Sequence, residues 1–191
     1  MTNNNMYFIA NWKMFGSVKS VNSLNKVISY SKTKKLKANI IYCPPYTLIK
    51  SFVDKTKKSN IKIGAQDCHA QPNYGPFTGA ISSKMIKDLG GKFVIIGHSE
   101  TRAENDNKKI NLKIKSALNE KLNVILCIGE KLIDKRKNKT KYVLKKQLLE
   151  GLKKLKNLNK VIIAYEPVWS IGTGIIPCLL YTSPSPRDDS Q

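Results

Sequence analysis

Short apolar runs alternate with longer amphipathic stretches along most of this chain. The apolar runs are continuous and end at glycine or polar residues, which predicts strands that a parallel sheet buries on both faces. The longer stretches place apolar residues at helical spacing with lysines between them, which predicts helices packed on that sheet. Strands are predicted at residues 7–11, 39–43, 61–65, 93–96, 123–128 and 160–165. Helices are predicted at residues 17–31, 46–57, 82–89, 107–119 and 140–157.

This alternation of strand and helix favours an α/β fold with a parallel sheet. The helix predicted at 140–157 carries Leu144, Leu148, Leu152 and Leu155 on one face and lysines on the others. A basic amphipathic helix can also bind a membrane surface or a partner protein. Its place between two strands favours an outer helix whose leucines face the sheet.

Polar side chains follow several of the predicted strands. Because the carboxyl ends of parallel strands meet at one edge of a sheet, these side chains are expected to form one site. They are Asn11, Lys13, His98, Glu100, Glu130 and Glu166.

The stretch AYEPVWSIGTG at 164–174 combines a strand end, a carboxylate and a loop with glycine hinges. Two interpretations are open: Glu166 is a catalytic base under a closing lid, or it is a solvated residue of an ordinary loop. The lid would consist of Pro167, Val168, Trp169, Ser170, Ile171, Gly172, Thr173 and Gly174.

Four motifs decide between these interpretations. ANWKM at 10–14, GHSE at 97–100, CIGE at 127–130 and AYEPVWSIGTG at 164–174 make residues 6–174 resemble the triosephosphate isomerase family. The resemblance implies a TIM (β/α)8 barrel, here truncated to about six βα units. It also implies a small phosphorylated triose as substrate and requires neither a metal nor a cofactor.

The resemblance assigns roles to individual residues of the site. Glu166 would remove the carbon-bound proton, and His98 would polarise the carbonyl as a neutral imidazole. Lys13 would stabilise negative charge, and Asn11 would orient the substrate. The backbone N–H of Gly172 would bind the phosphate. Glu100, close to Lys13, and Cys127, packed near the base, would have supporting roles.

The segment QDCHAQPNYGPFTG at 66–79 resembles the loop that family members insert into a neighbouring subunit. The resemblance implies a homodimer in which Thr78 contacts Asn11 of the other subunit. This chain has Thr101 and Ala80 where many family members have an arginine and a glutamate that pair across the interface.

The formal net charge of +21 would attract anions, so nucleic-acid binding is an alternative function. However, only Arg102, Arg136 and Arg187 can supply guanidinium contacts, and the lysines are spread over every predicted helix. We therefore expect no nucleic-acid partner, although the positive field would still steer a sugar phosphate towards the site.

The four cysteines lack the spacing of a metal or redox motif, which favours a reducing, cytoplasmic location. No signal peptide is recognisable. No run of about 18 apolar residues is present, so we expect no membrane span.

The chain has 191 residues, whereas a closed (β/α)8 barrel usually needs about 250. After Gly174 the sequence continues as IIPCLLYTSPSPRDDSQ, which has no lysine and no clear periodicity. We therefore divide the chain into a partial barrel at 1–174 and a foreign or frame-shifted tail at 175–191, with a divergent native tail as the alternative. The truncation leaves two alternative functions: an inactive fragment of the isomerase, or a basic fragment that binds anions or nucleic acid.

Overall fold

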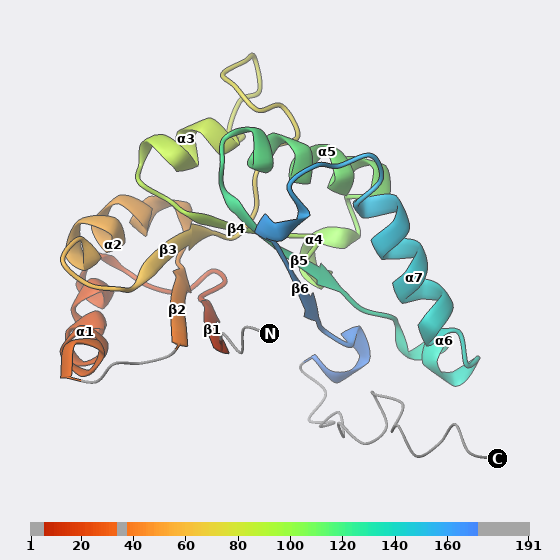
Figure 1. Ribbon diagram of the computed structural model, residues 1–191, viewed down its shortest axis with the longest axis horizontal. Helices are drawn as coiled ribbons and strands as arrows, with labels where there is room; N and C mark the ends of the chain where they lie inside the picture. Colours follow the sequence, from red (N-terminus) through yellow and green to blue (C-terminus); the bar gives the residue numbers. More distant parts are fainter. Residues whose placement is uncertain (1–5, 34–37, 172–191) are drawn as a thin grey trace.

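Six parallel strands form a single sheet in chain order (Figure 1). The computed structural model describes residues 6–33 and 38–171. Every strand lies within one residue of its predicted bounds. The strands are β1 (Met6–Asn11), β2 (Ala38–Cys43), β3 (Lys62–Ala65), β4 (Phe93–Ile96), β5 (Asn123–Ile128) and β6 (Val161–Tyr165).

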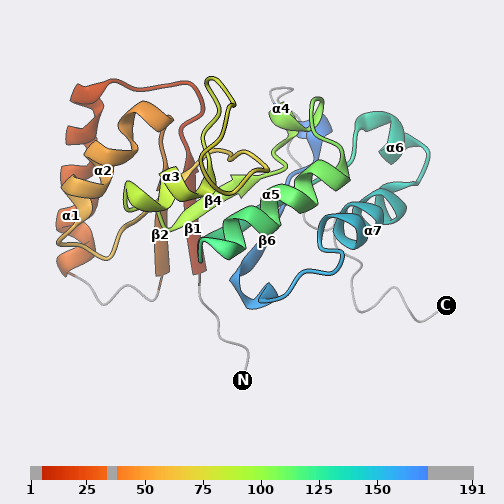
Figure 2. The same ribbon diagram turned by 90° about the horizontal axis from the view of Figure 1, so that it is seen from above.

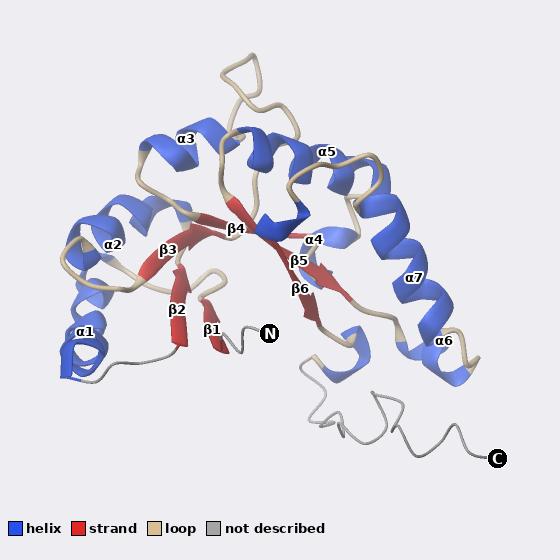
Figure 3. Cartoon of the chain, viewed as in Figure 1, coloured by secondary structure: helices blue, strands red, loops and turns tan. Residues whose placement is uncertain are grey.

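The helices form a layer on the outer side of the curved sheet (Figure 3). The α-helices are α1 (Leu24–Thr33), α2 (Ile49–Thr56), α3 (Ser83–Asp88), α4 (Ser99–Arg102), α5 (Asn107–Asn119), α6 (Leu132–Arg136) and α7 (Thr140–Gly151). Four 3-10 turns are η1 (Val18–Ser23), η2 (Tyr46–Leu48), η3 (Leu158–Lys160) and η4 (Val168–Ser170).

Apolar side chains fill both faces of the central strands, as the continuous apolar runs predicted. The larger core lies between the sheet and the helices, where Phe52, Ile86 and Leu126 are completely buried. A smaller core lies inside the arc of strands and includes Ile41, Ile95 and Ile125 from β2, β4 and β5. This two-sided burial is what a barrel wall requires.

The predicted helix at 140–157 is too long. Helix α7 ends at Gly151, and Lys154 and Asn157 then adopt positive φ angles of 56° and 61°, which an α-helix cannot contain. The predicted leucine face is confirmed, because the four leucines pack against the larger core.

Other helical elements also differ from the predictions. The segment predicted at 46–57 begins as the 3-10 turn η2, and α4 has no predicted counterpart. The segment predicted at 17–31 begins as the 3-10 turn η1 and becomes α-helical only from Leu24 to Thr33. Helix α6 was not predicted, because it lies in a lysine-rich stretch with few apolar positions. Its start is stabilised locally, since the Asp134 carboxylate accepts a hydrogen bond from the Lys131 N–H at 3.2 Å.

The arc of strands is open, because β1 and β6 are the two ends of the six-stranded order. A closed barrel of this type has eight strands. The structure therefore confirms the α/β class and the predicted barrel truncated to six strands. Among the described residues, no helix combines the length and apolar character needed to cross a membrane.

Helix α5 offers a test of local stability. The Asp106 carboxylate caps it by accepting a hydrogen bond from the Lys109 N–H at 2.8 Å. We expect Asp106→Ala to lower the free energy of unfolding by about 1 kcal/mol, because the first turn then loses this acceptor. Urea denaturation measures the difference. Asp106→Asn keeps an acceptor and is the control, so equal losses in both variants would contradict the capping role.

Candidate active site

Lys13 is held in a strained backbone conformation just beyond β1. Its φ angle is 52°, which is unusual for a residue with a side chain. The Lys13 N–H donates to Asn11 Oδ1 at 3.0 Å, and Gln66 Nε2 donates to the Lys13 carbonyl at 2.8 Å. Gln66 also donates to the Cys43 carbonyl at 2.9 Å, so it joins this turn to the end of β2. These bonds fix the direction in which Lys13 leaves the sheet.

His98 and Glu100 follow β4, at the carboxyl end of the sheet, where α4 also lies (Figure 2). His98 is buried, and its Nδ1 accepts a hydrogen bond from the Glu100 N–H at 3.3 Å. An accepting Nδ1 leaves Nε2 as the nitrogen that carries the proton in the neutral ring. Glu100 Oε1 lies 2.8 Å from Lys13 Nζ, so the ends of β1 and β4 are joined by an ion pair.

Glu166 is positioned by an extension of the pairing between β5 and β6. Its N–H donates to the Ile128 carbonyl at 2.8 Å, and the Val168 N–H donates to the Glu130 carbonyl at 3.1 Å. Gly129 lies between these two bonds, and a Cβ on Gly129 would be 1.9 Å from the Glu166 carbonyl oxygen. The approach of the two strand ends therefore requires glycine at this position.

The predicted base and electrophile lie next to each other. Glu166 Oε2 is 3.3 Å from His98 Nε2, but their orientation is poor for a hydrogen bond. This buried oxygen therefore has no hydrogen-bond partner among the described residues. The contact between Glu166 and His98 is therefore electrostatic.

The surroundings of His98 act on its pKa in opposite directions. The contact with Glu166 raises the pKa, burial lowers it, and the charge of Glu100 raises it further, so the pKa lies above its ordinary value.

The buried carboxylate of Glu130 holds the first part of the segment predicted as a lid. Glu130 is only 1% exposed and accepts hydrogen bonds from Trp169 Nε1 at 2.9 Å, Tyr165 OH at 3.2 Å and Thr140 Oγ1 at 3.3 Å. Lys135 Nζ lies 3.3 Å from the centroid of the Trp169 ring. The CIGE motif contains Glu130, but the motif does not indicate which residues its carboxylate contacts.

Other predicted site residues are placed as follows. Cys127 is buried, and burial together with the nearby Glu166 charge raises the pKa of its thiol to about 12. It is therefore a neutral thiol near pH 7, which fits the expected packing role. Thr78 is exposed in the loop that projects beyond α3 (Figure 1). Gly172, Thr173 and Gly174 lie outside the described residues.

A cavity of about 750 Å³ lies at the opposite end of the sheet. It is lined by residues at the starts of strands, among them Asn39, Lys62, Phe93 and Asn123. Barrel enzymes place their chemistry at the carboxyl ends of the strands, so this cavity is not the candidate active site.

The fold and the site define a class: an α/β-barrel enzyme in which a carboxylate lies beside an imidazole at the carboxyl ends of the strands. The comparisons identify the family, because the family model described as Triosephosphate isomerase matches residues 6–179. The chain belongs to the triosephosphate isomerase family, as the four motifs indicated.

Individual relatives agree with this assignment. The chain is 40% identical to triosephosphate isomerase of Clostridium botulinum (strain ATCC 19397 / Type A) over 168 residues, covering 86% of this chain and 67% of the relative. It is 44% identical to that of Dictyoglomus thermophilum over 170 residues, covering 86% and 68%. The crystal structure of triosephosphate isomerase from Bartonella henselae matches with a TM-score of 0.79 and 36% identity, covering 86% and 69%. The chain thus spans about two thirds of their length.

The close approach at Gly129 gives a specific prediction. Gly129→Ala would place a methyl group 1.9 Å from the Glu166 carbonyl, so the end of β6 must move. We expect a fall in the free energy of unfolding of about 1–3 kcal/mol, as for an overpacked core. Gly151→Ala is the control, because its nearest neighbours would be 3.9 Å away. Thermal unfolding of both variants measures the effect, and a Gly129→Ala protein as stable as the control would contradict the packing described.

The contact between His98 and Glu166 predicts a pH dependence. Because the folded-state pKa of His98 lies above 6.5, the contact stabilises the fold below about pH 6.5. That contribution is lost as the pH rises through the folded-state pKa. We expect Glu166→Gln to lower the pKa of His98, followed by NMR of the imidazole protons. His69, in the loop at 66–79, provides the reference signal. An unchanged or higher His98 pKa would contradict the contact.

Proposed function

We propose that the protein interconverts dihydroxyacetone phosphate and D-glyceraldehyde 3-phosphate through an enediolate. The observation that carries this proposal is the convergence of Lys13, His98, Glu100 and Glu166 from the ends of β1, β4 and β6. Family membership supports the same reaction.

Proton transfer is assigned to Glu166 and His98. The Glu166 carboxylate removes a proton from the carbon next to the substrate carbonyl, because it is the acceptor that lies at the site without a hydrogen-bond partner. His98 donates from Nε2 to the carbonyl oxygen, since its Nδ1 already accepts a backbone hydrogen bond. His98 then takes the proton of the neighbouring hydroxyl as the new carbonyl forms, and Glu166 returns its proton to the carbon that carried the original carbonyl, which completes the isomerisation.

Charge stabilisation is assigned to Lys13. Its side chain is 39% exposed, so it can contact an incoming anion while Glu100 holds it in place. A fixed cation of this kind stabilises negative charge on the enediolate oxygen and on the phosphate. Asn11 supports the turn through its bond to the Lys13 N–H. Glu100 also lies 3.5 Å from His98 Nδ1, which supports a supplementary role in proton relay.

Lid closure is assigned to residues 167–174. The contacts of Trp169 with Glu130 and Lys135 support an anchored first segment, beyond which Gly172 would offer its N–H to the phosphate. Closure over the site would exclude water and protect the enediolate.

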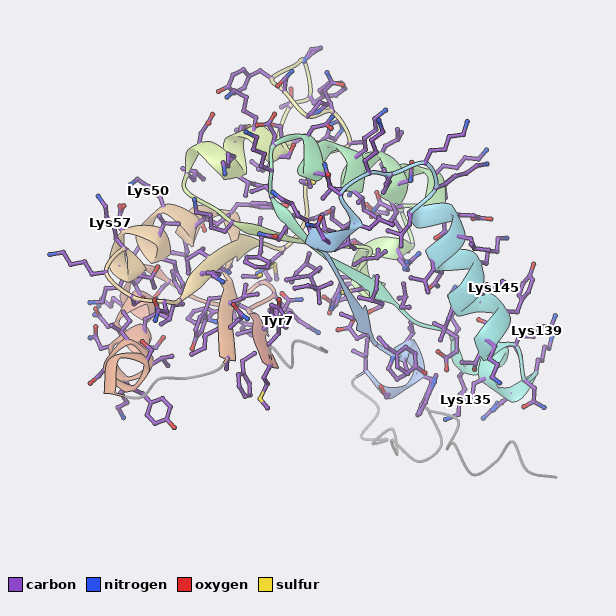
Figure 4. All side chains as sticks on the ribbon, viewed as in Figure 1. Tyr7, Lys50, Lys57, Lys135, Lys139 and Lys145 are labelled. Atoms are coloured by element: carbon purple, nitrogen blue, oxygen red, sulfur yellow. The ribbon has the colours of Figure 1, made fainter. Side chains whose placement is uncertain are left out.

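A second candidate function is that of an inactive fragment. It is favoured by one observation, namely that the chain spans about two thirds of its relatives' length. The resemblance places two further βα units, with phosphate-binding loops, beyond Gly174. Nucleic-acid binding has less support, because lysines such as Lys50, Lys57 and Lys145 are dispersed over the outer helices (Figure 4).

We also propose a homodimer and a cytoplasmic location. The projecting loop supports the dimer, since it exposes Phe77 and Tyr74 beside Thr78. We assign Thr78 to a contact with Asn11 of a second copy. The location is supported by Cys43, Cys68 and Cys127, which are buried free thiols.

An isomerase assay with glyceraldehyde 3-phosphate tests the proposed reaction. We expect activity that falls about a hundredfold in Glu166→Asp, because the shorter side chain withdraws the carboxylate from the reacting carbon. Glu104→Asp is the matched control, since Glu104 is exposed and has no assigned role in the reaction. Activity that survives Glu166→Asp unchanged would reject Glu166 as the base. A folded but inactive parent chain would favour the fragment.

A further inference from the structure

Positive charge is concentrated at one corner of the molecule, formed by α6, the turn after it and the first half of α7. Eight of the 16 residues from Lys131 to Lys146 are lysine or arginine, and Asp134 is the only acidic one. Their formal charge of +7 is one third of the net charge of the whole chain. We call residues 131–146 the basic corner. Figure 4 shows Lys139 and Lys145 on its outer side, away from the sheet.

The cations of the basic corner are not neutralised by neighbouring carboxylates. Within the described part of the chain, none of the eight forms an ion pair, whereas Lys50, Lys84 and Lys113 elsewhere do. Lys135 packs on the ring of Trp169, and the other seven cations are exposed. The corner therefore presents a positive surface that is open to an external anion.

Large apolar side chains are exposed on the same corner. Ile133 and Leu132 of α6 are 53% and 39% exposed, and Tyr142 of α7 is 65% exposed. They are separate from the leucines of α7 that pack against the larger core. The basic stretch at the end of α2 differs, because residues 49–58 include no exposed large apolar side chain. The basic corner thus combines dense positive charge with uncovered apolar area.

Hydrogen bonds hold the basic corner in one arrangement. The Lys139 N–H donates to the Asp134 carbonyl at 2.8 Å, which closes the turn between α6 and α7. The Thr140 hydroxyl donates to the buried Glu130 carboxylate at 3.3 Å, which ties the start of α7 to the end of β5. Because the backbone of the corner is already ordered, less conformational entropy is lost when its side chains bind a surface.

An anionic lipid surface matches this combination of groups. Lysines attract anionic headgroups, and apolar side chains between them enter the boundary between headgroups and acyl chains. Nucleic acid matches less well. Arg136 is the only arginine of the corner, and the side chains of Leu132 and Ile133 neither bind a phosphate nor stack as aromatic rings do on bases.

We propose that the basic corner is a docking surface through which the protein binds reversibly to membranes that contain anionic lipids. Binding of this kind requires no membrane-spanning helix. Lys135 of the corner contacts Trp169, so docking takes place beside the segment predicted as a lid. The inference rests on the charge and exposure of residues 131–146, and neither on the assigned reaction nor on the open edges of the sheet.

Vesicle sedimentation with the whole 191-residue chain tests the proposal. One set of vesicles contains phosphatidylcholine alone, and the other also contains about one third phosphatidylserine. We expect the protein to sediment with the anionic vesicles only, and to be released as added salt screens the charges. Equal binding to both sets, or binding to neither, would overturn the proposal. A protein that binds single-stranded RNA but no vesicles under the same conditions would also overturn it.

Two double variants of equal net charge locate the surface. Changing Lys137→Glu together with Lys139→Glu reverses two exposed cations of the corner, and we expect binding to anionic vesicles to fall about tenfold or more. Lys55→Glu together with Lys58→Glu is the matched control, because both lysines are exposed near the end of α2. Circular dichroism verifies that both proteins fold. Equal losses in the two variants would show that total charge alone drives binding, and would overturn the proposal.

The apolar contribution is tested at unchanged charge. Ile133→Ser should weaken binding about fivefold, because the isoleucine otherwise leaves water at the bilayer boundary. Leu149→Ser is the control, since Leu149 is 63% exposed on α7 beyond the corner. An Ile133→Ser protein that binds as tightly as the parent chain would overturn the proposal, because attraction by charge alone is not specific to a membrane.

Discussion

Parallel pairing of adjacent strands is the constraint on which the rest of this structure depends. It brings every strand's carboxyl end to one edge, so that residues separated by up to 153 positions, Lys13 and Glu166, contribute to one site. The pairing of β5 with β6 extends beyond the strands themselves, because its hydrogen bonds continue to Glu166. Gln147 of α7 strengthens it by bonding both the N–H and the carbonyl of Gly129, each at 2.9 Å. The position of Glu166 is thus fixed by backbone contacts.

Buried polar contacts set the details that strand pairing leaves open. Gln66 holds the strained turn at Lys13, and Glu130 gathers Trp169, Tyr165 and Thr140 around one carboxylate. Such groups are costly to bury without partners, so their hydrogen bonds specify one arrangement strongly. A helical layer alone could not define the orientation of the lid's first turn. The site therefore combines a rigid sheet with a few buried polar anchors.

The sequence predicted those features that depend on local pattern. The six strands are correct because continuous apolar runs of this length are typical of parallel strands, and the motifs identified the family. It failed where contacts between distant elements decide the outcome. Gln66 and Glu130 have ordinary surroundings in the sequence. Their importance arises from hydrogen bonds with Lys13 and Trp169, which are distant from them along the chain. Helix α7 was overextended because the leucine spacing continues past Gly151, while Lys154 and Asn157 turn the backbone.

The lysines of the outer layer have a further consequence because the six-stranded sheet is open. Unpaired parallel strands with exposed apolar side chains tend to join one another. Every molecule carries a formal charge of +21, so two open edges approach against strong mutual repulsion. That repulsion weakens as salt shortens the range of the field. The lysines thus act as a colloidal barrier, and the ionic strength of the surroundings sets how long an unclosed barrel stays dispersed.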